Sequence, residues 1–347
     1  MKSKAMKRIG NLYEKIISVE NLRLADEKAR RGKLHTYGVR VHDKNREANI
    51  IALHEALKTK TYKTSSYDVF TVYEPKERLI FRLPYYPDRI VHHAIMNVLE
   101  PIWERVFTHN TFSCIKKRGI EGCARYVDKI IKQYKGRPLY CLKIDIKKFY
   151  PSIDHTILKQ IVRRKIKDKD LLWLLDEIID SAEGLPIGNY LSQYLANLML
   201  AYFMHQVNER LKLDCTEYAD DICFFSDNKD VLHKAFHGFI KPYIEKNLNL
   251  SVKGNYQIFP IAKNRYDKSG RALDYVGYKF YREQKLIRKS IKQNFCRRAA
   301  KLNRHNPPLP PKVYKQDICS WLGWAKHCNS RHLLKTIIKP LYYDCIL

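Results

Sequence analysis

The chain has 347 residues, which is long enough for two or three packed subdomains, each with its own core. Hydrophobic residues make up 45% of it, so a largely disordered protein is excluded. Lys and Arg number 65 against 36 Asp and Glu, a net charge of +29. Such an excess repels itself and therefore favours a polyanionic partner.

Among polyanions, nucleic acid fits the composition better than a membrane surface. The 24 Tyr and 13 Phe supply ring faces on which bases stack, and no long apolar stretch or strongly amphipathic anchor occurs. Nine cysteines are scattered without a Cys-x-x-Cys pair, so neither a zinc ribbon nor a thioredoxin-like site is indicated. With no signal peptide visible, we predict reduced, mostly buried thiols in a cytoplasmic protein.

Residues 1–60 show helical periodicity. Ile16, Val19 and Leu22 share one helical face, and residues 50–57 repeat the pattern. The stretch between these helices, 29–46, is basic and punctuated by glycine. It is predicted to be a loop that either contacts phosphates or is simply solvated.

Residues 67–86 contain two apolar runs around "EPKE", which predicts a β-hairpin. Lys76, Arg78 and Arg82 place three cations on or beside it. Such a hairpin suits a triphosphate, because Lys and Arg neutralise and position phosphoryl oxygens. An exposed, salt-bridged hairpin is the alternative. A strongly periodic helix follows, and Pro101 is expected to kink or end it.

Residues 139–150, "LYCLKIDIKKFY", alternate apolar and polar positions as a strand does. Asp145 lies near the end of this strand among Leu142, Ile144 and Ile146. An isolated acid in such surroundings is expensive unless it is paired or bound to a metal.

The next motif is "GLPIGNYLSQ", in which Pro186 and Gly188 predict a turn before a helix. Polar residues lie on this mostly apolar helix or at its start. Their side chains are expected either to contact a base pair or the template backbone, or to cap the helix and bond within the core. These residues are Asn189, Ser192, Gln193 and Asn197.

Asp220 and Asp221 lie between two short apolar runs, where two strands are expected to meet at a turn. Adjacent like charges repel and are accommodated by a divalent cation, although a solvated Asp-Asp turn is the plain alternative. Neighbouring strands of one sheet would bring the pair to Asp145. Three carboxylates beside a basic groove form a two-metal site for in-line phosphoryl transfer.

Residues 273–281 are again strand-like, and the last 66 residues change in composition. Residues 282–347 hold 15 Lys and Arg against three acids and are expected to be helical, with a break at "NPPLPPK". Trp321 and Trp324 lie three apart on one helix face and are expected in a core rather than on a stacking platform.

In this order, the motifs resemble those of reverse transcriptases. "DIKKFYPSI", "GLPIGNYLSQ", "YADD" and "VGY" resemble motifs A, B, C and E, and "YEPKER", "RLP", "DRIVHHAIMNVLEPI" and "SCIKKRGI" resemble the finger motifs. The resemblance covers roughly residues 60–290. It implies an α+β right-hand polymerase with an antiparallel-sheet palm. The implied domains are an N-terminal helical extension (1–60), fingers (61–135), a palm (136–282, with a finger insertion near 160–185) and a helical thumb (283–347).

The resemblance also implies a catalytic centre. Asp145, Asp220 and Asp221 match the metal-binding triad, and Ile146 would offer its backbone carbonyl to the second metal. The expected cofactor is a pair of Mg²⁺ ions, with Mn²⁺ as a possible substitute.

For the incoming nucleotide, Tyr150 matches the steric gate that excludes ribonucleotides by filling the space of the 2′-hydroxyl. Lys76 and Arg82 match the triphosphate-contacting finger cations, with Arg78 as a competitor. Lys253 lies where related polymerases place a lysine near the pyrophosphate, plausible as a proton donor, although a surface lysine is equally compatible with the sequence.

Ile187 and Gly188 would lie against the incoming nucleotide and its template base. An apolar Ile where an amide is usual removes hydrogen-bonding capacity at the nascent pair, and we expect looser discrimination there. The expected template and primer contacts are Gln193, Gly277 and Tyr278.

The second motif also indicates a subfamily. Most reverse transcriptases have Gln before this glycine and a Ser-Pro pair, where this chain has Ile187-Gly188 and Ser192-Gln193. The variant is similar to the enzymes of diversity-generating retroelements, bacterial or phage-encoded proteins that copy a template-repeat RNA with adenine-directed errors. "NLYEKI…NLRLAD" and "SWLGWAKHCNS" fit the same subfamily.

The partners implied are an RNA template, a DNA or RNA primer, dNTPs and a small basic accessory protein, and no membrane. Three other functions remain open. The chain could be a defence-associated, retron-like or group II intron-like reverse transcriptase, or a non-catalytic nucleic-acid-binding scaffold. It could also be an RNA-dependent RNA polymerase, which the bulky Tyr150 disfavours.

Overall fold

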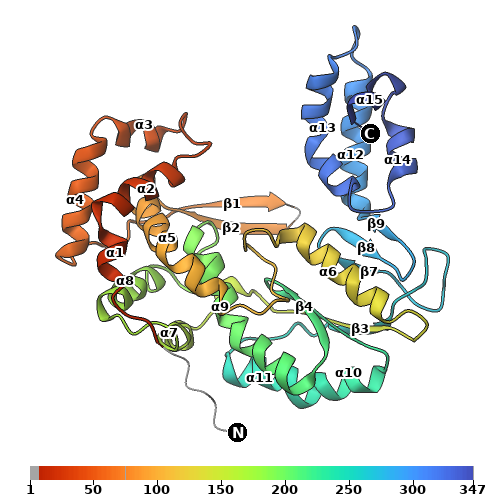
Figure 1. Cartoon of the computed structure of the whole chain (residues 1–347), viewed down its shortest axis with the longest axis horizontal. Coiled ribbons are helices and arrows are strands. Elements are labelled where there is room, and N and C mark those ends of the chain that lie inside the picture. Colours follow the sequence, from red (N-terminus) through yellow and green to blue (C-terminus); the bar gives the residue numbers. More distant parts are fainter. Residues whose placement is uncertain (1–7, 75, 347) are drawn as a thin grey trace. The chain divides into compact units, whose positions relative to one another are not determined.

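The computed structural model describes residues 8–74 and 76–346 (Figure 1). The chain forms two compact units, each assembled from three stretches of sequence. The first unit comprises Met1–Cys114, Asp145–Lys212 and His237–Gly254. The second unit comprises Ile115–Ile144, Leu213–Phe236 and Asn255–Leu347. The finer division into extension, fingers, palm and thumb stays a prediction.

The first unit is mostly helical, and several of its helices begin at a capping side chain. Ser18 accepts a hydrogen bond from the backbone N–H of Asn21, and Asp154 and Asp168 cap α7 and α8 in the same way. The helices are α1 (Tyr13–Ile17), α2 (Val19–Ala29), α3 (Tyr37–Asp43), α4 (Arg46–Lys58), α5 (Ile90–Glu104), α7 (His155–Arg163), α8 (Lys169–Ile179), α9 (Tyr190–Gln206) and α11 (Lys241–Asn247), with the short elements η1 (Tyr85–Arg89), η2 (Tyr150–Ser152) and η3 (Val207–Leu211).

The predicted hairpin is present in the first unit. β1 (Asp68–Glu74) and β2 (Lys76–Arg82) pair antiparallel, with Asp68 opposite Arg82. The expectation at Pro101 is wrong in part, because α5 continues beyond it to Glu104. Only three residues follow Pro101, so its missing N–H affects just the last turn.

A four-stranded sheet forms the centre of the second unit. Its strand order is β4-β5-β3-β6, made of β3 (Tyr140–Asp145), β4 (Asp214–Tyr218), β5 (Asp221–Ser226) and β6 (Gln257–Pro260). β4 pairs antiparallel with β5, and β3 with β6. The boundary between the units falls at the end of β3, between Ile144 and Asp145.

Helices and a second sheet complete this unit. α6 (Gly119–Gln133) packs against β4, where the thiol of Cys123 lies 3.4 Å from the hydroxyl of Thr216. A three-stranded antiparallel sheet follows. The remaining elements are β7 (Leu273–Tyr275), β8 (Tyr278–Phe280), β9 (Lys285–Ile287), α10 (Lys229–Ala235), α12 (Lys289–Asn303), α13 (Pro311–Ala325), α14 (Arg331–Ile337), α15 (Tyr343–Ile346), η5 (Pro340–Tyr342) and η4 (Phe236–Ile240), which straddles the unit boundary.

The C-terminal helices enclose a core of their own, which includes Phe295, Tyr314 and Ile318. Trp321 and Trp324 pack against this core, as expected from the sequence. The Pro-rich break separates α12 from α13 as predicted.

Two broader expectations concern membrane-spanning helices and the burial of the cysteines. Within residues 8–74 and 76–346, no helix is long and apolar enough to cross a membrane. The eight cysteines whose side chains are described are free thiols, but only Cys123, Cys141, Cys215 and Cys223 are buried. Burial is therefore confirmed for half of them rather than for most.

A buried histidine pair predicts a pH dependence of stability. Burial lowers the pKa of His92 to about 3 and, helped by Lys33 and Lys28, that of His93 to about 4, from 6.5. Below pH 6.5 the unfolded chain takes up protons that the folded chain refuses. Stability is therefore complete above pH 6.5 and falls as the pH approaches 4, by roughly 3 kcal/mol for the fully buried His92 and by up to about as much again for the half-buried His93.

Denaturant midpoints measured between pH 7 and pH 4 test this. His93→Asn should flatten the slope, whereas the exposed His35→Asn should leave it unchanged. An equally steep slope in His93→Asn would contradict the assignment.

Candidate active site

The Asp-Asp turn joins β4 to β5. Tyr218 pairs with Asp221, leaving Ala219 and Asp220 as the turn. Ala219 adopts a left-handed φ of 54°, which is uncommon for a residue with a side chain. β5 is fully buried just beyond the turn, from Ile222 onward. The two carboxylates are therefore carried at the rim of a rigid core.

Asp221 faces a lysine that the sequence analysis missed. The ammonium of Lys143 lies 2.9 Å from the Asp221 carboxylate and donates to the carbonyl of Asp274 at 2.7 Å. The hydroxyl of Tyr275 donates to the backbone carbonyl of Asp221 at 3.0 Å. Burial opposes the charge of Lys143, but the Cys223 thiol and the Asp221 carboxylate outweigh burial, so the pKa of Lys143 is raised.

A signal for Lys143 was present in the sequence. Side chains two apart on a strand share a face, so the spacing of Lys143 and Asp145 places both on the same side of β3. The neutralising cation could have been inferred from this period.

Asp145 has a lysine partner of its own within the first unit. The ammonium of Lys253 lies 2.5 Å from Oδ1 of Asp145. The backbones are tied as well, since Lys253 N–H donates to the Asp145 carbonyl at 2.9 Å and Lys147 N–H to the Ser251 carbonyl at 2.8 Å. Neither bond uses the carbonyl of Ile146, which lies between them in a bridge to Val252.

These donors fit a hard divalent cation. Carboxylate and backbone carbonyl oxygens are the ligands that Mg²⁺ takes. The ammonium groups of Lys143 and Lys253 stand where positive charge is attracted to Asp221 and Asp145. Among the described residues, no three His, Cys, Asp or Glu side chains are grouped as a ready-made metal site.

The loop before α9 connects three of the predicted nucleotide-contacting parts of the first unit. Its Ile187 carbonyl accepts from the Phe81 N–H of β2 at 2.8 Å. Its Leu185 N–H donates to the Tyr150 carbonyl at 2.8 Å. The loop therefore joins the cation-bearing hairpin to the start of η2.

Gly188 is required by the chain itself at this loop. Its φ is 124°, and a Cβ there would lie 2.5 Å from the carbonyl oxygen of Phe81. Gly184 has a similar constraint, because a Cβ would lie 2.6 Å from the Tyr150 carbonyl. The sequence analysis gave Gly188 a close approach to a ligand, and here the close approach is to β2.

The finger cations lie on β2. Arg82 pairs with Asp68 across the hairpin and lies over the ring of Phe70, 5.3 Å from its centroid. Arg78 is exposed, opposite Val72. Lys76 begins β2, but its side chain lies outside the described part of the structure.

For the four polar residues at α9, the sequence left open either contact with a base pair or the template, or helix capping and hydrogen bonding within the core. Asn197 donates to the Ser113 carbonyl at 2.7 Å and Asn189 to the Tyr67 hydroxyl at 2.9 Å, and both are buried. Ser192 is buried too. Gln193 is exposed, so it is the one of these four whose side chain faces solvent.

Gly277 and Tyr278 lie at the β7–β8 turn in the second unit. Gly277 has a φ of 83°, and a Cβ there would overlap the ring of Trp324. Tyr278 is 1% exposed, and its hydroxyl donates to the Trp324 carbonyl at 3.1 Å. In this structure both residues pack α13 onto the hairpin, and a primer contact stays a prediction.

Carboxylates at an antiparallel hairpin tip, with a cation-bearing hairpin elsewhere in the chain, are typical of nucleotide polymerases that use metal ions. The profile of the family "Reverse transcriptase (RNA-dependent DNA polymerase)" matches residues 74–257, more than half of the chain. The chain belongs to this family. The match confirms the predicted fold class, the α+β right-hand polymerase.

Individual relatives are more distant. Protein YkfC of Escherichia coli (strain K12) is 29% identical over 154 residues, 40% of each chain. The Retron Se72 reverse transcriptase of Salmonella heidelberg (strain 579083-10) is 25% identical over 54% of this chain and 49% of its own length. The matches thus span less than half the length of these relatives. A telomerase structure from Candida albicans, in complex with a TWJ fragment of telomeric RNA, aligns with 81% of this chain and 57% of its own at 11% identity and a TM-score of 0.47.

The loop geometry generates a stability prediction. Gly188→Ala should lower the free energy of unfolding by about 1–3 kcal/mol, because the new Cβ meets the Phe81 carbonyl at an unfavourable φ. Gly238→Ala is the matched control, since nothing lies within 4 Å of a Cβ there. Denaturant unfolding checks both, and equal midpoints for the two variants would refute the constraint.

Proposed function

We propose that the chain is an RNA-directed DNA polymerase that extends a DNA or RNA primer with dNTPs on an RNA template. The observation that carries this is the placement of acids at strand ends. Asp145 closes β3, Asp221 opens β5, and these strands are neighbours in one sheet. Membership of the reverse transcriptase family supports the same reaction.

Asp145, Asp220 and Asp221, with the Ile146 carbonyl, would hold two Mg²⁺ ions, or Mn²⁺ in their place. Bound there, the ions supply Lewis-acid chemistry that lowers the pKa of the primer 3′-hydroxyl and neutralises the leaving pyrophosphate. The three carboxylates position the ions. The turn at Ala219 fixes the positions of two of these carboxylates, Asp220 and Asp221.

The lysines act on the substrate in this proposal. Lys253 pairs with Asp145 in this structure. Released from that pair, its ammonium protonates the leaving pyrophosphate oxygen. Lys143 keeps compensating the charge of Asp221, since its contacts with Asp274 and Tyr275 hold it in place.

The hairpin and loop would hold the incoming nucleotide. Lys76 and Arg82 bind the triphosphate, with Arg78 as the competitor for that role. Tyr150 acts as the sugar gate, and Ile187 and Gly188 lie against the nascent pair. The bonds from Phe81 to Ile187 and from Leu185 to Tyr150 support a common position for these groups. Gln193 contacts the template, and Gly277 and Tyr278 the primer end.

The acidic pair is tested by substitution. Asp220→Ala with Asp221→Ala should reduce dNTP incorporation on an RNA template by at least about 10³-fold, because the ion ligands are lost. Asp230→Ala with Glu245→Ala removes the same charge at exposed helix positions and should change the rate less than about twofold. Full incorporation by the Asp220/Asp221 variant would instead favour a non-catalytic nucleic-acid-binding scaffold.

Sugar selection separates this reaction from RNA synthesis. The wild type should prefer dNTPs over rNTPs, and Tyr150→Ala should shift that ratio toward rNTPs by about tenfold or more, because the 2′-hydroxyl gains space. Tyr150→Phe keeps the ring and should retain the preference. A wild type that prefers rNTPs would identify an RNA-dependent RNA polymerase.

The specific role we propose is that of an error-prone enzyme of a diversity-generating retroelement, working with a small basic accessory protein. Ile187 supports it. Its backbone is held by Phe81, so an apolar side chain is presented where an amide is usual in the family. The similarity to a retron reverse transcriptase favours the second candidate, a retron-like or other defence-associated or group II intron-like enzyme.

Fidelity at adenine distinguishes these roles. Ile187→Gln should lower misincorporation opposite template adenine by about 3–10-fold, because the amide restores hydrogen bonds at the nascent pair. Ile187→Leu keeps the apolar character and should keep the error rate. Sequenced cDNA gives both rates, and an unchanged frequency in Ile187→Gln would remove the proposed cause.

Genomic context tests the subfamily independently of fidelity. An accessory gene beside near-identical repeats that differ at adenines is expected. Its absence would favour the retron-like role without changing the chemistry.

A further inference from the structure

A basic hollow opens in the second unit, away from the acidic turn. It has a volume of about 760 Å³ and is lined by the end of α6, the loop after it, the loop after β6 and the segment after β8. Arg137, on its wall, pairs with Asp227 at 3.0 Å, and Asp227 directly follows β5. Asp221 opens the same strand, so about 20 Å of strand separates the two ends. The hollow is distinct from the proposed catalytic centre.

Two of its cations are rigidly held. Arg282 donates to the carbonyls of Tyr134 at 3.1 Å and Arg137 at 2.5 Å. Arg137 lies over the ring of Tyr134, 4.8 Å from its centroid. These contacts order the wall before any ligand arrives.

Three exposed lysines lie on the same wall. Lys132, Lys135 and Lys263 have no ion pair within the described residues. Two carboxylates line the hollow as well. Asp267 is used internally, because it accepts from the Lys263 N–H at 2.7 Å and from the Ser269 hydroxyl at 2.6 Å, whereas Glu283 is exposed and offsets one of the lining cations. The hollow therefore presents a surplus of positive charge to solvent.

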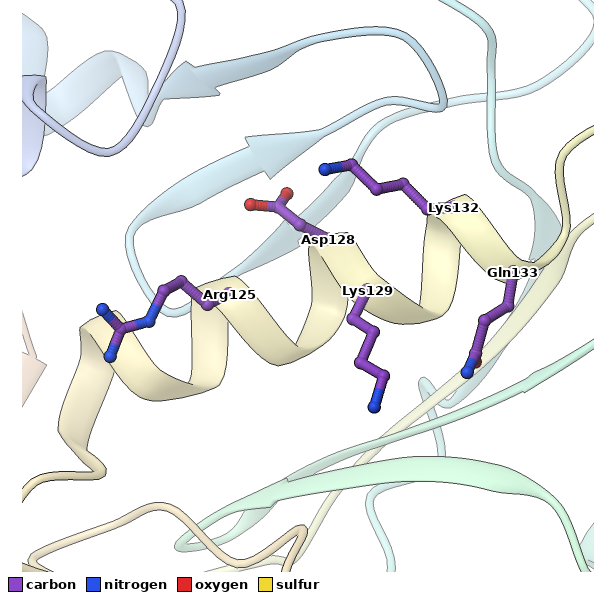
Figure 2. A pocket seen from close by; sticks show the side chains of 5 residues that line it. All are labelled: Arg125, Asp128, Lys129, Lys132 and Gln133. Atoms are coloured by element: carbon purple, nitrogen blue, oxygen red, sulfur yellow. The ribbon is translucent and has the colours of Figure 1, made fainter.

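The basic surface of the hollow includes Lys132 of α6 but not Lys129, one turn earlier. Figure 2 shows Lys129 and Lys132 extending from different sides of the helix. Nearer the start of α6, Arg125 pairs with Glu121 and Asp128 with Lys285. The unpaired charge is thus concentrated at the C-terminal end of α6.

The loop 263–271 adds a stacking surface beside the hollow. Tyr266 is 74% exposed, and the guanidinium of Arg265 lies 4.6 Å from its ring centroid. The ends of the loop are fixed, because Ala262 N–H donates to the Arg271 carbonyl at 3.0 Å and Arg271 N–H to the Pro260 carbonyl at 3.1 Å. An exposed aromatic ring on an anchored, basic loop is the arrangement on which an unpaired base stacks.

We propose that the hollow and the loop 263–271 together bind single-stranded RNA outside the template–primer track. Lys132, Lys135 and Lys263 contact successive phosphates, and Tyr266 stacks on one unpaired base. A duplex is excluded because its bases are not available to Tyr266. The choice of RNA over DNA rests on the proposed function, in which the template is RNA.

The test measures binding separately from catalysis. Fluorescence anisotropy with a labelled 15-nucleotide single-stranded RNA, without dNTPs, is compared for the wild type and Lys132→Glu/Lys135→Glu/Lys263→Glu. Affinity at 0.15 M salt should fall at least about tenfold, and the slope of log K against log salt should become shallower by about 2. Tyr266→Ala, which changes no charge, should weaken binding by about fivefold or more.

Controls separate this site from bulk charge and from the polymerase reaction. Lys229→Glu/Lys234→Glu/Lys246→Glu makes the same charge change at exposed lysines that do not line the hollow and should weaken RNA binding less than about threefold. dNTP incorporation on a short RNA–DNA template–primer should stay within about twofold for both triple variants, whose melting temperatures confirm folding. If the proposed function is wrong, the wild type will incorporate no dNTP in this assay. The comparison of RNA affinities can still be interpreted in that case.

Three outcomes would overturn the proposal. They are unchanged RNA affinity in the hollow variant, an equal loss in the control variant, and an equal loss for single-stranded DNA of the same sequence, which would remove the assignment to RNA. Retained affinity in Tyr266→Ala would remove the stacked base.

Discussion

Repulsion between carboxylates is the constraint on which the centre of this molecule depends. Asp220 ends the two-residue turn and Asp221 opens β5, and the buried strand behind them holds both at a rim. Such a concentration of negative charge requires cations nearby. The chain supplies lysines for this purpose: Lys143 for Asp221 and, separately, Lys253 for Asp145. The negative charge of two of the three acids is therefore offset by the chain itself.

A second constraint comes from close backbone packing rather than from charge. The loop 184–189 makes main-chain contacts with β2 on one side and with the residues around Tyr150 on the other. Gly184 and Gly188 permit these contacts because a side chain would strike a carbonyl oxygen at either position. Since the contacts are made by backbone atoms, the side chain at 187 can vary without disturbing the framework. This explains how an Ile can stand where an amide is usual.

Local pattern made much of this architecture predictable. The alternation in residues 139–150 gave the strand that ends at Asp145, the "EPKE" stretch gave the β1–β2 hairpin, and the break at "NPPLPPK" separated two helices. What it could not give depended on tertiary contacts. One example is the bond from the Tyr278 hydroxyl to the Trp324 carbonyl, 46 residues later; the primer contact of Tyr278 stays a prediction. The exposure of Cys114 and Cys319 has the same origin, because packing partners distant in sequence decide which thiols are covered. Lys143 differs from these cases, because its two-residue spacing from Asp145 in the sequence already places both side chains on one face of a strand.

The packing of Trp324 on the β7–β8 turn has a mechanical consequence. Gly277 receives the indole ring, Tyr278 bonds to the Trp324 backbone, and Arg288 N–H donates to the Gly277 carbonyl at 2.9 Å. Asn329 adds two further bonds to Lys285 of β9. The β7–β8 hairpin and the helical C-terminal region are therefore packed together as one body. A rotation of these helices would therefore move the hairpin by the same angle.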